Sequence, residues 1–416
     1  MNYYKRCDCR YCSSTNLEKI ISLGHQPPSN SFINEEDFSE EEMYPLELYF
    51  CKDCFLVQLL DIVSGSDIFD DYHYRSSSSR ALVEHLSLMV ESLTKRFDIK
   101  SGDTVVDIGC NDGVTLKAYN VEGLKCVGVE PSKVSEVAES LGFNVVKSFF
   151  NKETSKHIVE NFGNAKIVTA TNVFAHADNM HEFIEGIPNL LSDDGVFVVE
   201  VSYIVDLIDN NLFDTIYHEH LCYLGLTPLV KFIKQYDMHV FDIDRLSLGA
   251  SGPAIRVYIQ KNNGVNAISN NVSKILSDEI DWGVNNVKKY KEFEARVQIV
   301  KKDTINLLKK LKSEGCKIGG FGAPAKGNTM LNFYGINSKI IDCIADNTTI
   351  KQGRYTPGSH IKIIDDDSFN NLNYDYALLL SWNYLDYFLA NSDYINNGGK
   401  FIVPLPFPKI VPVRSS

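Results

Sequence analysis

The stretch "DTVVDIGCNDGVTL", residues 103–116, joins an apolar run to a glycine-containing turn and the start of a helical pattern. Its glycines, Gly109 and Gly113, have the spacing G-x-x-x-G, and Asp107 and Asp112 stand close to them. Glycine lets the backbone turn sharply toward a ligand, and the following helix offers free N–H groups. The spacing differs from the G-x-G-x-x-G of dinucleotide-binding loops. It therefore predicts a strand–turn–helix cofactor loop of another kind.

Four more apolar runs follow this loop, with room for helices between them. They are "KCVGVEPS" (125–132), "VVKSFF" (145–150), "AKIVTATNVF" (165–174) and "GVFVVEVS" (195–202). Strands that alternate with helices of about ten or more residues form a parallel sheet with helices on both faces. A second unit of this kind begins at "KIGGFGAPAKGNTMLNFYGI" (317–336). We therefore expect an α/β protein with two Rossmann-like units.

The length of 416 residues favours two or three domains over one core. Residues 1–75 form a distinct part, because they hold five of the ten cysteines and are rich in turns. We expect a small N-terminal domain at 1–75, a central α/β domain that contains the first glycine loop at 76–262 and a C-terminal α/β domain at 263–416. Residues 268–313 have the pattern of one long amphipathic helix or a pair of helices.

Composition excludes several functions. A net charge of −13 argues against a general nucleic-acid binder, which usually has a basic face. No apolar run approaches the roughly 18 residues that a membrane span needs. The start, "MNYYKRCDCRYC", lacks the apolar core of a secretory signal, and ten cysteines without such a signal fit a reducing compartment. We expect a cytoplasmic protein without membrane or nucleic-acid partners.

Two C-x-x-C pairs lie in the N-terminal part: Cys9 with Cys12, and Cys51 with Cys54. Four thiolates in two such pairs are the ligand set of a structural zinc site. The alternatives are unpaired buried cysteines and a nucleic-acid knuckle, but the flanks are acidic and aromatic rather than basic. Cys7 is a rival to Cys9 as a ligand. The sequence predicts structural Zn²⁺ here.

Acidic residues in the first glycine loop suit a cofactor that has a positively charged amino-acid end and no phosphate. S-adenosylmethionine is such a cofactor. Glu130, at the end of the second apolar run, can accept hydrogen bonds from both ribose hydroxyls. Ser148 and Phe149 follow the third run and would lie beside the adenine.

A second glycine loop, "GGFGAPAKGNTMLN" (319–332), follows a strand and opens a helix. Its glycines let a ligand come close to the backbone, and Lys326 offers a positive charge for a phosphate. Asp346 ends the next strand. Such an arrangement is typical of a nucleotide site, although the spacing matches neither the Walker A loop nor the dinucleotide fingerprint. A purely structural glycine turn is the alternative.

The segment "DTIYHEHLCYL" (214–224) gathers two histidines, a glutamate and tyrosines. His218 and His220 could hold a metal together, but the H-E-x-x-H helical spacing is absent. The N-terminal cysteines are the better metal ligands. Acid–base chemistry is therefore the preferred interpretation of this segment.

Taken together, these motifs resemble the sugar C-methyltransferases of deoxysugar pathways, which methylate C3 of nucleotide-linked 4-keto-6-deoxyhexoses. The resemblance covers the chain in order through six stretches. They are "CRYC…CKDC", "YHYRSSSS", "DIGCNDG" with "GVEPS", "TNVFAH", "YHEH" and "GFGAPAKGNT…YTPGSHI". One stretch departs from it, because "GASGPAIR" (249–256) stands where relatives often have an "HGGSLR"-like turn.

The resemblance implies sites for both ligands and for the reacting groups. The reacting groups are expected at Tyr72, His176, Tyr217, Glu219 and His220. Contacts to S-adenosylmethionine are expected from Asp107, Gly109, Asn111, Asp112, Gly113, Glu130, Ser148, Phe149 and Asn172. Contacts to the nucleotide sugar, expected to be TDP-linked, would come from Tyr74, Tyr203, Gly322, Lys326, Asn328, Asp346 and His360. A monomer or weak dimer is expected.

The chemistry needs a base near C3 and donors near the C4 oxygen, because carbon becomes a nucleophile only as an enolate. His220 is the first choice for the base, and His176 is the alternative; Tyr217 and Tyr72 would polarise the ketone. Other hypotheses are methylation of oxygen, methylation of a different activated sugar, an oxidoreductase that uses the second glycine loop, and a zinc-containing adaptor that only binds nucleotides.

Overall fold

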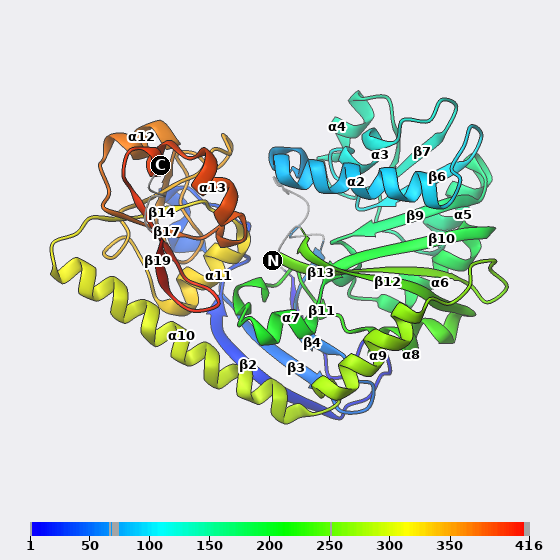
Figure 1. The fold of residues 1–416 in the computed structure, drawn as a ribbon, viewed down its shortest axis with the longest axis horizontal. Coiled ribbons are helices and arrows are strands. Elements are labelled where there is room, and N and C mark those ends of the chain that lie inside the picture. The colour runs from blue at the N-terminus through cyan, green and yellow to red at the C-terminus, as the bar shows by residue number, and fades with distance from the viewer. Residues whose placement is uncertain (1, 66–67, 69–74, 250–251, 412–416) are drawn as a thin grey trace.

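The computed structural model describes residues 2–65, 68, 75–249 and 252–411. It is an α/β protein, as the sequence predicts, and Figure 1 shows one lobe around each of two sheets. The curved strands β2 and β3 and the long helix α10 run between these lobes (Figure 1).

The central sheet has seven strands in the order β12-β13-β10-β9-β6-β7-β8. Their bounds are β6 Thr104–Ile108, β7 Lys125–Val129, β8 Asn144–Val146, β9 Ala165–Thr171, β10 Leu191–Ser202, β12 Met238–Gly249 and β13 Gly252–Lys261. The strands from β8 to β10 are parallel, and β13 pairs with β10 antiparallel. The carboxyl ends of the parallel strands therefore meet at one edge, where open α/β sheets bind ligands.

Helices cover both faces of this sheet, because its strands are buried on both sides. They are α2 Arg80–Arg96, α3 Val114–Ala118, α4 Ser135–Ser140, α5 Lys152–Phe162, α6 Met180–Leu190, α7 Ile204–Asp209 and α8 Leu226–Ile233. Helix α2 buries an apolar stripe against the sheet and is capped by Ser79, whose side chain accepts from the Leu82 N–H.

The C-terminal sheet has six strands in the order β16-β15-β14-β17-β18-β19, all parallel except β19. Its strands are β14 Ile318–Phe321, β15 Cys343–Ala345, β16 Lys362–Ile364, β17 Tyr376–Leu379, β18 Lys400–Val403 and β19 Lys409–Val411. Its helices are α11 Ala325–Tyr334, α12 Asp366–Asn371, α13 Leu385–Asn391 and α14 Asp393–Asn396. Residues 268–313 form the pair α9 Asn270–Trp282 and α10 Val287–Ser313.

The N-terminal part contributes three strands to a third sheet and two more to a separate two-stranded ribbon. Strands β2 Leu17–Gln26, β3 Tyr44–Cys51 and β4 Val57–Leu59 form a sheet, and β1 Tyr3–Lys5 pairs with β5 Asp61–Val63. The sheet is completed by β11, Cys222–Tyr223, which pairs with β4. A segment from the middle of the chain is thus built into the N-terminal sheet.

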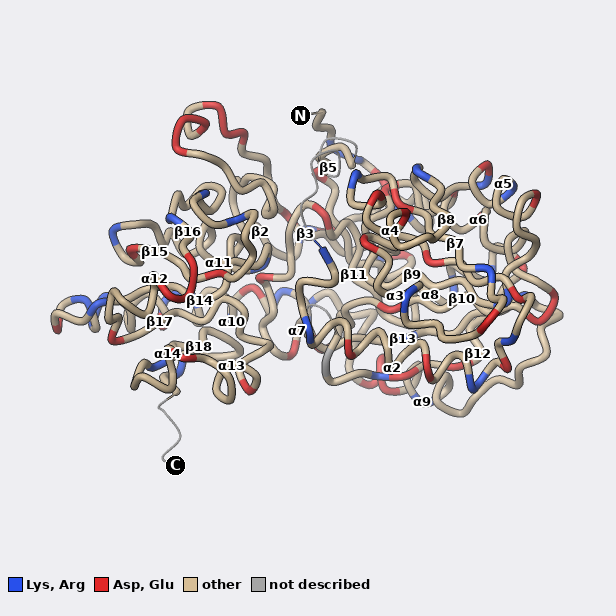
Figure 2. Tube along the Cα trace, turned by 90° about the horizontal axis from the view of Figure 1, so that it is seen from above, with Lys and Arg blue, Asp and Glu red and all other residues tan. Residues whose placement is uncertain are grey.

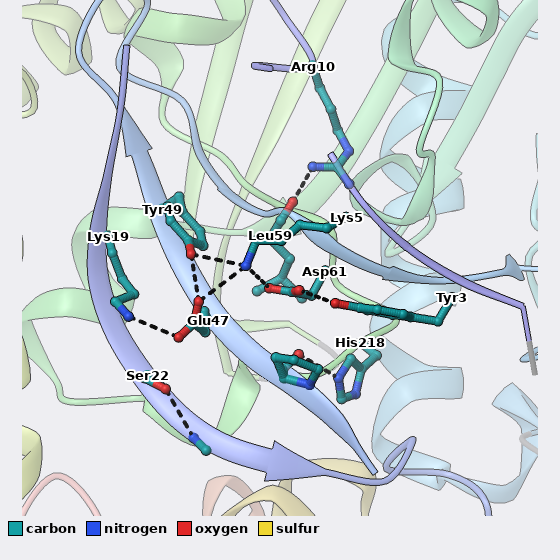
Figure 3. Close-up of polar contacts among 12 residues, drawn as sticks. Tyr3, Lys5, Arg10, Lys19, Ser22, Glu47, Tyr49, Leu59, Asp61 and His218 are labelled. Carbon is teal, nitrogen blue, oxygen red and sulfur yellow. Dashed lines mark hydrogen bonds and ion pairs between the residues drawn. The ribbon is translucent and has the colours of Figure 1, made fainter. Parts of the chain in front are cut away.

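Figure 3 shows the polar contacts that join this sheet to the neighbouring ribbon and to His218. Lys5 lies 3.2 Å from Asp61 and 3.5 Å from Glu47. The imidazole of His218 reaches the carbonyl of Pro45 on β3 at 3.2 Å. The segment that carries His218 is therefore docked on the N-terminal sheet.

Figure 2 shows acidic and basic residues interspersed along both lobes. Among the helices of the described residues, none is long and apolar enough to cross a membrane.

Candidate functional site

Two knuckles bring four cysteines together at the start of the chain. The Sγ atoms of Cys9, Cys12, Cys51 and Cys54 all lie within 4.8 Å of one another, as a tetrahedral zinc site requires. In each knuckle a residue with positive φ follows the second cysteine: Ser13 (54°) and Phe55 (74°). Among the described residues Cys7 is exposed and stands outside this cluster, so the group that could hold a metal ion includes Cys9 and not Cys7.

The first glycine loop is built for close approach at the end of β6. Gly109 has a φ of 72°, and a Cβ there would lie 2.7 Å from the Val173 side chain. The loop is covered by the segment before α2, since the Ser76 N–H donates to Asn111 Oδ1 at 2.9 Å and the Ser77 N–H donates to Asp112 Oδ2 at 3.2 Å. These contacts fix the loop against the central sheet.

A cavity of about 450 Å³ opens at this loop. Its walls include Asp107, Gly109, Asn111, Glu130, Ser148, Phe149 and Asn172 from the central sheet, and Ile62 to Gly65 from the N-terminal part. Seven of the nine residues expected to contact the methyl donor line it. We call it the donor cavity.

Two buried carboxyl groups stand in the wall of the donor cavity. Glu130 accepts from the Asn111 N–H at 3.0 Å through one oxygen and from Ser132 through the other. Asp107 accepts from the Thr169 hydroxyl at 2.6 Å, and burial raises its pKa to about 7. Both groups suit a ligand that brings hydroxyl groups and a positive charge.

A second cavity, of about 410 Å³, lies between the two lobes. The C-terminal domain supplies Gly322, Lys326, Asp346 and Lys351, and the central domain supplies Tyr217 and His220. Residues Pro324, Ala325 and Lys326 bring the N-terminus of the ten-residue helix α11 to its wall, where free N–H groups favour an anion. We call it the acceptor cavity.

The two cavities share three wall residues: Asn172, His176 and Glu219. The rings of His176 and His220 are stacked, with centroids 5.2 Å apart, and Tyr217 lies 4.0 Å from His220 on another side. Four of the five residues expected to act in the reaction are thus gathered at one junction. The fifth, Tyr72, and its neighbour Tyr74 lie outside the described residues.

His220 has a defined hydrogen-bonding state. Its Nδ1 lies 2.9 Å from the carbonyl of Thr215, and since a carbonyl only accepts, we assign the proton to Nδ1 and a lone pair to Nε2. Burial lowers the pKa of His220 to about 4 and that of His176 to about 3. Both rings are therefore neutral at pH 7 and able to accept a proton.

Glu219 is buried between the cavities, at 4% exposure. Burial raises its pKa to about 7, against the opposing effect of a hydrogen bond from the Asn30 amide to Oε1 at 2.7 Å. The group therefore exchanges its proton near neutral pH, which suits proton transfer.

Lys326 is buried in the acceptor cavity, with burial lowering its pKa to about 8. Its ammonium donates to Asn383 Oδ1 at 2.5 Å and lies 4.0 Å from the ring of Trp382. The indole N–H of Trp382 donates to Asp214 Oδ2 at 2.6 Å, and Asp214 is fully buried. This chain of contacts joins the C-terminal domain to the segment that carries His220.

Other residues named from the sequence line neither cavity in the described part of the chain and make contacts within the protein. Tyr203 donates its hydroxyl to Glu279 at 3.0 Å, and Asn328 donates its amide to the Ser29 carbonyl at 2.7 Å. His360 pairs with Glu41 at 2.8 Å. Asp112 and Gly113 form the back of the first glycine loop, where Gly113, at φ 84°, caps α3.

Three residues of the acceptor cavity region were not found from the sequence: Asn30, Trp382 and Asn383. Asn30 belongs to the turn-rich stretch "GHQPPSNSF", which has no motif that points to a ligand. Trp382 follows β17, and the carboxyl end of a strand beside the glycine loop is the one signal that could have found it.

Comparison with known proteins gives three matches along the chain. A zinc binding domain family matches residues 9–69, a methyltransferase domain family matches residues 80–241, and a C-methyltransferase C-terminal domain family matches residues 249–406. The C-methyltransferase NovU of Streptomyces niveus is 31% identical over 412 residues, which cover 98% of each chain.

Two further matches cover less than half of the chain. The (S)-coclaurine N-methyltransferase of Thalictrum flavum subsp. glaucum is 25% identical over 45% of this chain and 52% of its own. The solved structure of the plantazolicin methyltransferase BpumL in complex with SAH covers 45% of this chain and 88% of its own, with 15% identity and a TM-score of 0.35. The full-length match and the three domains place the chain in the zinc-containing, S-adenosylmethionine-dependent C-methyltransferase family that includes NovU.

Proposed function

We propose that this enzyme methylates C3 of a nucleotide-linked 4-keto-6-deoxy sugar, most simply a TDP-sugar, through an enolate. The observation that carries the proposal is the junction of the cavities, where His176 and Glu219 stand in both walls and His220 stands beside them. Methyl transfer needs donor and acceptor to meet at one point, and this point holds groups that can accept a proton.

The donor cavity suits S-adenosylmethionine, which supplies an electrophilic sulfonium methyl group when bound. In the proposal Glu130 accepts from the ribose hydroxyls at the end of β7, and Asp107 and the N–H groups of the glycine loop hold the amino-acid end. Ser148 and Phe149 line the same wall and would flank the adenine. Asn172 would lie near the methyl group that is transferred, because it lines both cavities.

The acceptor cavity suits a nucleotide diphosphate, because its cations stand on the C-terminal wall. Lys326 and the N-terminus of α11 would receive the diphosphate, and Gly322 leaves room for the backbone to approach it. The sugar would then extend toward Tyr217 and His220 on the opposite wall. Asp346 accepts from the Ala323 N–H at 2.7 Å and so sets the shape of the glycine loop.

In the proposed reaction the Nε2 lone pair of His220 takes the proton from C3, and the electron pair of that C–H bond forms the enolate of the C4 ketone. Tyr217, whose ring lies against His220, donates to the developing oxyanion. The C3 carbon then bonds to the methyl group as the carbon–sulfur bond breaks. Glu219 orients a sugar hydroxyl or relays the proton, since it titrates near neutral pH.

A panel of 4-keto nucleotide sugars incubated with enzyme and methyl donor tests the function. We expect one acceptor to gain a single methyl group by mass spectrometry, with NMR placing it on C3. In D₂O, with S-adenosylhomocysteine in place of the donor, we also expect deuterium to enter at C3. A methyl group on oxygen, or C3 that never exchanges its proton, contradicts the proposal.

A further inference from the structure

The N-terminal zinc-binding part reaches the acceptor cavity through one turn. After β2 the chain passes through Pro27 and Pro28 to Ser29 and Asn30, and Asn30 stands in the cavity wall. The prolines restrict the backbone of the turn, which lowers the entropy cost of holding it in place. A residue far from Glu219 in the sequence is thus delivered beside it.

The turn is anchored on the C-terminal domain immediately before Asn30. The Ser29 carbonyl accepts from the Asn328 amide at 2.7 Å, and the Ser29 hydroxyl lies 3.1 Å from that of Thr329. Asn328, Thr329 and Ser29 are all fully buried or nearly so, at 0%, 0% and 2% exposure. Asn30 is therefore held at a fixed place by α11, the helix whose first turn faces the acceptor cavity.

From this place Asn30 donates its amide to Glu219 Oε1 at 2.7 Å. An amide donor favours the carboxylate over the carboxylic acid, because a hydrogen bond to the charged oxygen is stronger than one to the neutral group. The contact also fixes which oxygen of Glu219 points to the protein. The second oxygen, Oε2, is then the one available to the acceptor.

We propose that Asn30 is a positioning residue for Glu219, through which the zinc-binding domain sets the orientation and ionisation of a group in the active site. The inference rests on the proposed function, because it assigns Glu219 a part in handling the acceptor. It predicts that the zinc-binding domain is needed for turnover itself and not only for folding.

The first test is Asn30→Ala, assayed for turnover across pH. Without the amide the Glu219 pKa rises further, so fewer molecules carry the carboxylate at pH 7. We expect kcat at pH 7 to fall by about 10- to 100-fold, the usual cost of losing a hydrogen bond to a charged group. We expect much of it to return at about pH 9, where the carboxylate forms again. Asn30→Asp, which places a second carboxylate beside Glu219, should lose more at pH 7.

Asn34→Ala is the matched control. Asn34 lies in the same segment, where it contacts Asp37 at the start of a short 3-10 helix, Glu35–Glu40, and it should leave kcat and its pH dependence unchanged. Zinc content and the affinity for S-adenosylmethionine should be the same in all these variants. A fall in kcat for Asn30→Ala that is equal at every pH would overturn the proposal, as would wild-type turnover.

A second readout needs no turnover and so separates this inference from the proposed function. At about pH 8, Asn30→Ala should lower the Tm of the wild-type protein more than it lowers the Tm of Glu219→Gln, because the carboxylate depends more strongly on the donor. Equal shifts in the two backgrounds would refute the contact as a positioning device. If the Tm shifts are unequal, so that Asn30 and Glu219 are coupled, but the enzyme methylates no acceptor of the panel, the proposed function alone is refuted.

Discussion

His220 and His176 are stacked in one site, but their surroundings distinguish them. His220 has its Nδ1 proton fixed by the Thr215 carbonyl, which leaves Nε2 as a base. His176 stands in both cavity walls and has the lower pKa, about 3, because burial and the neighbouring His220 both oppose its charging. The free Nε2 of His220 therefore favours this residue for proton removal in the proposed reaction.

His220→Ala should abolish methyl transfer, with a loss of at least about 100- to 10,000-fold in kcat, the range for a general base. Deuterium incorporation at C3 should vanish with it, whereas His176→Ala should retain exchange. Binding of S-adenosylmethionine, measured by calorimetry, should stay close to that of the wild type. His157→Ala, an exposed histidine on α5, is the control. Exchange lost in His176→Ala but kept in His220→Ala would reverse the assignment.

Glu219 should cost the folded protein stability at neutral and higher pH. Its pKa is raised from 4.5 to about 7 in the folded protein, so the folded state binds more protons than the unfolded state between these values. Stability therefore falls as pH rises from 4.5 to about 7, by up to about 3 kcal/mol.

Glu219→Gln should remove this loss and raise the Tm at pH 8, while turnover falls. At pH 4, where the carboxyl group is protonated in both states, the two Tm values should converge. A Tm difference that does not depend on pH would show that Glu219 is not buried with a raised pKa. The control is Glu91→Gln, an exposed residue on α2.

At the scale of elements, sequence periodicity predicts the strands β6 to β10 of the central sheet, because each contains a buried run between turn signals, but it leaves out the antiparallel strands β12 and β13. It does not predict β11, since two residues, Cys222 and Tyr223, carry no period of their own and pair only where β4 is present. The same limit applies to the acceptor cavity. Tyr217 and His220 can be named from their motif, but Asn30 reaches them only through the fold.

The contact between α11 and the segment 213–224 predicts a role for Trp382, whose indole joins Asp214 to Lys326. Trp382→Phe removes the donor to the buried Asp214 and should raise the KM for the acceptor about tenfold, an effect of the size of one lost hydrogen bond. The affinity for S-adenosylmethionine should not change, because Trp382 does not line the described walls of the donor cavity.

The matched control uses the other tryptophan of the chain. Trp282 also donates its indole N–H to a carboxylate, Asp209, at 2.9 Å, but in an exposed position. Trp282→Phe should keep the wild-type KM. It also leaves Trp382 as the sole indole, so the addition of the acceptor nucleotide should change the tryptophan fluorescence of this variant. An unchanged signal at saturating acceptor would place the nucleotide elsewhere.

At the scale of the whole molecule, the zinc-binding part touches both cavities. Residues 62–65 line the donor cavity, and Asn30 lines the acceptor cavity. Arg10, between Cys9 and Cys12, is buried and lies 3.1 Å from Asp178 in the donor wall. The cysteine motif predicts the metal, but this position between two sites follows only from the tertiary structure. Structural zinc stabilises the fold of small domains by roughly 10–16 kcal/mol. Loss of the metal should therefore weaken the binding of both S-adenosylmethionine and the acceptor.

Cys51→Ser tests this coupling. The wild-type protein should contain about one zinc ion per chain by elemental analysis, and the variant should contain almost none. Loss of the metal should destabilise the sheet β2-β3-β4, with which β11 pairs. We therefore expect turnover to be lost and the Kd for S-adenosylmethionine to rise at least about tenfold. Cys7→Ser, which replaces an exposed cysteine outside the cluster, should keep its zinc and its activity.

A Cys51→Ser protein that is folded, free of metal and fully active would show that the metal stabilises neither cavity. Normal donor affinity with lost turnover would restrict the coupling to the acceptor side, where Asn30 stands.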